Sequence, residues 1–163
     1  MFFASTTFTL VHVALSLIGI VAGFVAVIAI LQDRKADGWT LTFFVTTVLT
    51  SVTGFLFPFT VFLPSHGTGV ISLIVLALAL AGRYVFRFAG PWRWIYAVGV
   101  VLGLYFNVFV LVVQMFQKIP ALHALAPTQS EAPFAVAQII VLAIFVWLCF
   151  AAAKRFRPAP VAA

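Results

Sequence analysis

Five long apolar stretches, separated by short polar segments, constrain the fold of this chain more than any other feature. They cover residues of about 8–31, 41–63, 66–88, 92–117 and 133–153. A helix needs about 20 apolar residues to cross a hydrocarbon layer about 30 Å thick. Because lipid offers no partners to backbone N–H and C=O groups, each stretch is predicted to be a transmembrane helix. The predicted fold class is all-α, a polytopic membrane bundle of five transmembrane helices that forms a single domain over residues 1–163.

The composition excludes an ordinary soluble domain. Hydrophobic residues make up 65% of the chain and charged residues only 7%, whereas a soluble domain carries about 25% charged residues. The net charge of +6 would suggest nucleic acid as the partner of a soluble protein. Here the basic residues flank apolar stretches, so the predicted partner is the anionic surface of a lipid bilayer and not nucleic acid.

The basic residues also predict the orientation of the chain. Of the nine lysine and arginine residues, all except Lys118 lie in or near the first and third connections or next to the C-terminus. They are Arg34, Lys35, Arg83, Arg87, Arg93, Lys154, Arg155 and Arg157. By the positive-inside rule this side is cytoplasmic, which predicts an outside N-terminus and a cytoplasmic C-terminus. Compactness and short loops indicate a bacterial inner membrane.

Three local patterns refine the helix ends. The segment Met1–Thr7 lacks the basic residues of a signal peptide, so we expect the first stretch to stay in the mature protein. Pro58 predicts a kink in the second helix. The T-x-x-E sequence Thr128–Glu131 has the form of a capping box ahead of Pro133, which suits the first turn of the fifth helix.

Motifs of known catalytic sites are absent from the sequence. The single cysteine, Cys149, excludes an internal disulfide and C-x-x-C redox chemistry. There is no G-x-S-x-G, no P-loop and no pair of carboxylates inside the apolar stretches. The sequence therefore assigns no enzymatic activity, and no motif identifies a family.

The three histidines all fall on the predicted outer side. His12 lies just inside the first helix, His66 begins the third, and His123 lies in the last connection, near the only outer acid, Glu131. Polar groups at membrane depth cost free energy, so they mark candidate functional sites.

Helical spacing aligns small and polar residues on three of the helices. The stripes are His12, Ser16, Gly19, Gly23 and Ala26 on the first, Thr47, Thr50, Ser51 and Gly54 on the second, and Gly99, Gly103, Asn107, Val110, Gln114 and Gln117 on the fourth. Such stripes face other helices, and G-x-x-x-G spacing is typical of close helix packing. We therefore expect a polar seam in the outer half of the bundle.

This seam leads to a hypothesis of cofactor binding at the periplasmic face, in one of three forms. A transition metal would take His12, His66 and His123, with Glu131 as an oxygen ligand. A b-type haem would take His12 and His66 as axial ligands, with Gln114 in the lining. A quinone would bond to a histidine and Glu131. The sequence leaves these forms open.

Two functions of other classes remain as alternatives. The apolar surface suits a non-enzymatic accessory subunit that packs on a membrane protein partner, or a homo-oligomer. The seam also suits a small-solute channel, although no acidic residue lies inside any apolar stretch, and cation transport usually relies on one.

Overall fold

The computed structural model describes residues 6–57 and 64–158, and the regular structure within these ranges is entirely helical. The α-helices are α1 (Thr6–Leu31), α2 (Asp37–Gly54), α3 (Pro64–Leu80), α4 (Trp92–Lys118), α5 (Pro120–Leu125) and α6 (Ala132–Arg155). A π-helical turn, η2 (Ala81–Val85), continues α3. The predicted all-α fold class is confirmed.

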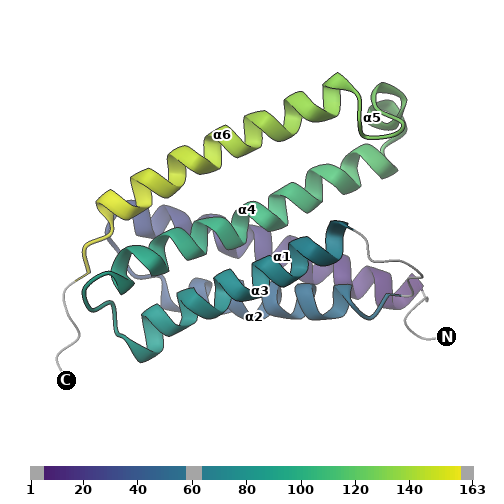
Figure 1. Ribbon diagram of the computed structural model, residues 1–163. Helices are drawn as coiled ribbons and strands as arrows, with labels where there is room; N and C mark the ends of the chain where they lie inside the picture. Colours follow the sequence, from purple (N-terminus) through teal and green to yellow (C-terminus); the bar gives the residue numbers. More distant parts are fainter. Residues whose placement is uncertain (1–5, 58–63, 159–163) are drawn as a thin grey trace.

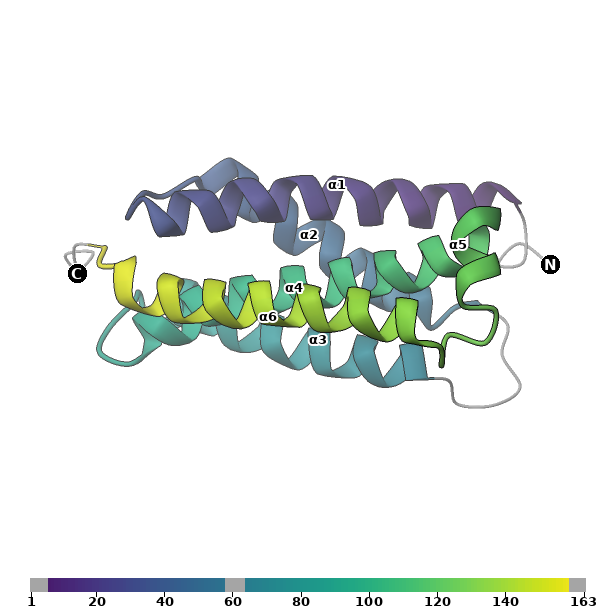
Figure 2. The same ribbon diagram turned by 90° about the horizontal axis from the view of Figure 1, so that it is seen from above.

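The long helices α1, α2, α3, α4 and α6 run back and forth along one bundle (Figures 1 and 2). The start of α1 and the short helix α5 lie at one end, which we call the α5 end. The connections 32–36 and 86–91 and the last turn of α6 lie at the other, which we call the basic end. Helix α1 therefore begins at the α5 end, and helix α6 finishes at the basic end.

Within the described residues, four helices are long and apolar enough to cross a membrane. They are α1, α3 together with η2, α4 and α6. The chain is thus a candidate multi-pass membrane protein. Helix α2 differs because it has only 18 residues and is rich in threonine, which lowers its hydropathy. It starts at Asp37, before the predicted boundary, and the predicted kink at Pro58 lies outside the described residues.

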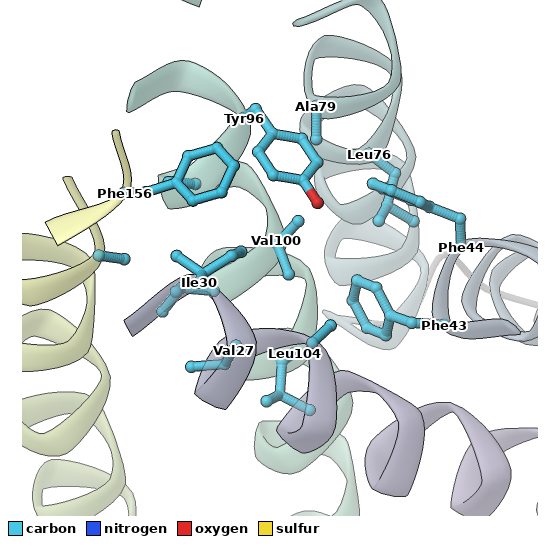
Figure 3. Close-up of a cluster of buried hydrophobic side chains, with 14 of the residues drawn as sticks. Val27, Ile30, Phe43, Phe44, Leu76, Ala79, Tyr96, Val100, Leu104 and Phe156 are labelled. Atoms are coloured by element: carbon cyan, nitrogen blue, oxygen red, sulfur yellow. The ribbon is translucent and has the colours of Figure 1, made fainter. Parts of the chain in front are cut away.

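Helix α4 forms the centre of the bundle and packs against α1, α3 and α6. Its residues Tyr96, Val100 and Leu104 are fully or almost fully buried. Figure 3 shows them between Val27 and Ile30 of α1, Phe43 and Phe44 of α2, and Leu76 and Ala79 of α3. Phe156, which follows α6, covers Tyr96 at a ring-centroid distance of 5.3 Å. The core therefore lies in the half of the bundle nearer the basic end.

Close helix contacts in this half depend on glycine. A Cβ atom at Gly23 of α1 would lie 2.7 Å from Leu104 and 2.9 Å from Phe43. A Cβ atom at Gly103 of α4 would lie 3.1 Å from the tip of the same Phe43 ring. The ring of Phe43 thus fills the space that two glycines leave. The prediction that the glycine stripes serve helix packing is confirmed.

Polar contacts hold the basic end together. Arg83 of η2 forms an ion pair with Asp37 at the start of α2 and donates a hydrogen bond of 3.1 Å to the Tyr96 hydroxyl. The backbone N–H of Arg157 donates to the Asp33 carboxylate at 2.6 Å. These bonds connect α2, η2 and α4, and join the end of α6 to the first connection.

Helix α6 exposes most of its apolar side chains. Only Phe145 and Ala152 are buried among its described residues, whereas Ile139, Trp147 and Phe150 are 63–67% exposed. A continuous apolar surface of this kind needs an apolar surrounding. The apolar helices thus indicate the lipid bilayer as the surrounding medium.

The contact between Gly99 and α3 provides a test of this packing. A Cβ atom at Gly99 would lie 2.8 Å from the Ala79 Cβ and 3.4 Å from the Val75 carbonyl oxygen, neither of which can rotate away. We expect Gly99→Val to lower the free energy of unfolding by about 1–3 kcal/mol, the usual cost of overpacking. Gly38→Val is the matched control, because nothing lies within 4 Å of its Cβ position. Denaturant unfolding in detergent measures both, and equal losses would contradict the packing described here.

Candidate functional site

A cavity of about 420 Å³ lies among α1, α2, α3 and α4 in the half of the bundle nearer the α5 end. This volume is within the range of pockets that bind small molecules. Its walls are mainly apolar, with polar side chains from all four helices. The polar lining residues are Thr9, His12, Ser16, Thr50, Ser51, His66, Thr68, Ser72, Asn107, Gln114 and Lys118.

The cavity contains the polar seam expected from helical spacing. Each of the three stripes contributes lining residues: His12 and Ser16 from α1, Thr50 and Ser51 from α2, and Asn107 from α4. The structure therefore confirms that these stripes converge, and it adds α3 as a fourth wall.

His12 is held in a defined hydrogen-bonding state. Its Nδ1 lies 2.8 Å from the Thr53 Oγ1. The Thr53 hydroxyl donates its own proton to the Leu49 carbonyl oxygen at 2.7 Å. Thr53 is therefore the acceptor and His12 Nδ1 the donor. In the neutral imidazole this leaves Nε2 as an acceptor, and no described residue bonds to it.

Aromatic contacts fix the two histidine rings that line the cavity. The His12 ring meets Phe57 edge to face, with ring centroids 5.1 Å apart. His66 is only 6% exposed, and its ring stacks on Phe55 at a centroid distance of 5.6 Å. Histidines from α1 and α3 thus lie on one cavity with little freedom to turn.

Ser72 of α3 has an unusual environment. It is 3% exposed, and its Oγ has no hydrogen-bond partner among the described residues. It also lines the cavity. A buried hydroxyl without a partner costs free energy.

The basic-end wall of the cavity is a bridge between α4 and α2. The Asn107 amide donates to the Thr47 hydroxyl at 3.0 Å. Gly19 of α1 lies against this pair, because a Cβ there would be 3.3 Å from the Thr47 hydroxyl and 3.5 Å from the Asn107 amide nitrogen. On the basic-end side of this bridge the helices are in close contact. On its α5-end side they separate around the cavity.

Two of the predicted ligands, His123 and Glu131, are not among the cavity-lining residues of the described chain. His123 is exposed on α5. The Glu131 carboxylate accepts hydrogen bonds from the Thr128 hydroxyl at 2.9 Å and from the backbone N–H groups of Thr128 and Ser130. Desolvation acts to raise the pKa of Glu131, but these hydrogen bonds outweigh it and lower the pKa.

The same bonds correct the expected capping box. Glu131 does reach back to the Thr128 N–H, but Thr128 is not the N-cap, because α6 begins at Ala132 and Glu131 itself precedes it. The carboxylate therefore closes its own loop and does not cap the helix in the expected reciprocal way.

The cavity brings together His12, His66 and Gln114 of the predicted site residues. Among the described residues there is no group of three or more His, Cys, Asp or Glu side chains placed to hold a metal ion. The four-ligand metal site thus stays a prediction without support from the geometry. Two histidines in a mainly apolar cavity suit an apolar molecule with a few polar groups better.

Sequence reasoning missed Ser72, Lys118 and Thr53. Ser72 had a signal, because His66, Gly69 and Ser72 recur every three residues and therefore lie near one face of α3. Lys118 follows Gln114 by one turn and continues the stripe of α4. Thr53 had no signal beyond its threonine-rich helix, since its role depends on the neighbouring helix.

No family model matches the chain, and neither curated proteins nor solved structures show a significant similarity to it.

The unpartnered hydroxyl of Ser72 predicts an unusual response to mutation. We expect Ser72→Ala to raise the free energy of unfolding of the ligand-free protein by about 1 kcal/mol, because it removes a buried group that has no partner. Ser16→Ala is the matched control, since the Ser16 hydroxyl also lines the cavity but donates to the His12 carbonyl oxygen at 2.8 Å. It should show no such gain. Denaturant unfolding in detergent measures both variants, and a loss of stability in Ser72→Ala would show that its hydroxyl is already bonded.

Proposed function

We propose that this protein binds a small lipid-soluble molecule in the cavity, with a polar end that donates a hydrogen bond to His12. The observation that carries the proposal is the Thr53–His12 contact, which leaves Nε2 as the acceptor of a histidine that lines a mainly apolar cavity. A molecule that carries a neutral hydrogen-bond donor on a flat apolar ring would fit this acceptor and this cavity. A quinol, whose aromatic ring carries two hydroxyl groups, is the ligand class that fits best.

Further groups around the cavity suit the rest of such a ring. Phe55 and Phe57 present aromatic surfaces beside the two histidines, and aromatic rings pack well on one another. Gln114 offers polar atoms to a second hydroxyl or carbonyl. The proposal concerns binding, and no chemical step is assigned to the chain.

The second candidate is a haem or metal cofactor held by His12 and His66. It is favoured by the same contact, because histidine ligands usually donate their other ring N–H to a nearby acceptor, which orients the ring. The visible spectrum and metal content of the purified protein separate the candidates. A Soret band would select haem, and stoichiometric zinc or copper would select a metal.

We further propose that the chain crosses a bacterial inner membrane five times, with its N-terminus outside. Helix α2 would provide the fifth span: 18 residues at about 1.5 Å per residue give about 27 Å, close to the hydrocarbon thickness. The opposite placement of the start of α1 and the end of α6 (Figure 2) supports an odd number of crossings. The arginines and lysines at the basic end support its cytoplasmic location.

The binding proposal is tested with 1,4-naphthoquinol and the protein in lipid nanodiscs. We expect His12→Ala to weaken binding about tenfold or more, because it removes the acceptor for a buried donor. Thr53→Val should weaken it less, since the imidazole remains but its orientation is lost. Isothermal titration calorimetry under anaerobic conditions measures both. His123→Ala is the control, because His123 is exposed on α5, and it should bind normally.

Two results would overturn this proposal. Wild-type protein that binds neither naphthoquinol nor naphthoquinone would leave the cavity without the proposed ligand class. Equal affinity of wild type and His12→Ala would show that His12 is not the acceptor.

The topology is tested with single cysteines in a Cys149→Ser background. We expect Ala124→Cys to react with a membrane-impermeant maleimide on intact spheroplasts, and Arg157→Cys to react only after lysis, because the basic end faces the cytoplasm. Both residues are exposed at opposite ends of the bundle. Labelling of Arg157→Cys from the outside would reverse the orientation.

A further inference from the structure

Two cavity-lining residues of α1 also face away from the bundle. Val13 and Leu17 are 38% and 48% exposed, yet both line the cavity. The neighbouring turn behaves differently, because Ile20 lines the cavity and is only 8% exposed. The cavity therefore reaches the lateral surface of the bundle along α1, in the half nearer the α5 end.

The opposite rim of this opening belongs to α4. Leu104, Leu111 and Lys118 are spaced by seven residues, so they lie on one face of the helix. Leu104 is close to Gly23, which places this face toward α1. Two turns further along, Leu111 lines the cavity, and Lys118 lines it at the end of the helix. Helices α1 and α4 thus touch at Gly23 and are separated by the cavity beyond it.

No residue of α6 is among the lining residues in the described part of the chain. Helix α6 packs mainly on α4. The gap between α1 and α4 therefore has mainly apolar rims, Val13 and Leu17 on one side and Leu111 on the other, with Lys118 at the end of the α4 rim. Helix α6 contributes no wall to it.

We propose that this gap is a lateral opening to the outer leaflet, through which the ligand enters and in which its hydrocarbon tail stays while its head bonds to His12. This inference rests on the proposed function and narrows the ligand class to lipid-phase molecules with a polar aromatic head and a long tail, such as prenylated quinols. Exposed apolar rims suit a hydrocarbon chain, and the polar groups lie deeper, where the head would bind. A water-soluble ligand would not need these rims.

The test compares 1,4-naphthoquinol with the same head carrying a long prenyl tail, using wild type and Leu17→Trp in nanodiscs. We expect the indole to fill the gap and to weaken binding of the tailed ligand about tenfold or more, as overpacking does elsewhere. Affinity for the tail-free head should fall several-fold less than affinity for the tailed ligand, because the tail and not the head lies in the gap, and the retained head binding also shows that the variant is folded. Val21→Trp is the matched control, because Val21 is 57% exposed on the same helix and does not line the cavity.

A second measurement locates the tail directly. A photoreactive diazirine at the middle of the prenyl tail should label the peptides that contain Val13, Leu17 and Leu111. The lateral opening is wrong if Leu17→Trp binds both ligands normally while His12→Ala binds neither, or if the label falls only on α2 and α3. If wild type binds neither ligand, the proposed function itself fails and this inference fails with it.

Discussion

Helix α4 packs closely on α1 and α3 where glycines remove side chains at the contacts, and the rest of the structure depends on this packing. Phe43 of α2 inserts its ring between Gly23 of α1 and Gly103 of α4. The close contacts end at the Asn107–Thr47 hydrogen bond. Beyond that bond, polar and aromatic side chains line a space that the helices do not close. One half of the bundle is thus a dense core, and the other half holds a cavity lined by polar and aromatic side chains.

The hydrogen-bonding property of the cavity depends on two linked hydrogen bonds. The Leu49 carbonyl oxygen accepts the Thr53 proton, so Thr53 can only accept from His12, and His12 presents a lone pair. A threonine that bonds to its own helix is often structurally neutral. Here the same intrahelical bond determines the state of a histidine on another helix.

The sequence predicted the helices and the convergence of the polar stripes, because both follow from periodicity. The stripe from His12 to Ala26 has the spacing of one helix face, and its burial follows from that spacing. It did not predict that α2 ends at Gly54, before residue 63, the predicted end of the second stretch. It grouped His123 and Glu131 with His12 because all three fall on the predicted outer side. The position of a residue in the sequence predicts at which end of the bundle it lies. It does not predict how far that residue lies from others at the same end. The Glu131 carboxylate instead accepts hydrogen bonds from its own loop. Residue patterns do not reveal that these local donors bind the carboxylate. The partner of His12 depends on the neighbouring helix and was equally hidden.

The insertion of Phe43 has a consequence for how such a chain can diverge. Its ring touches the Cβ positions of two glycines on different helices, so a methyl group gained at either glycine would press on this ring, and also on Leu104 at Gly23 or on Leu76 at Gly103. These positions are coupled by packing despite their separation in the chain. Homologous sequences should vary there jointly, with less side-chain volume at position 43, 76 or 104 wherever alanine replaces one of the glycines. Such covariation would identify distant relatives whose overall sequence similarity has already decayed.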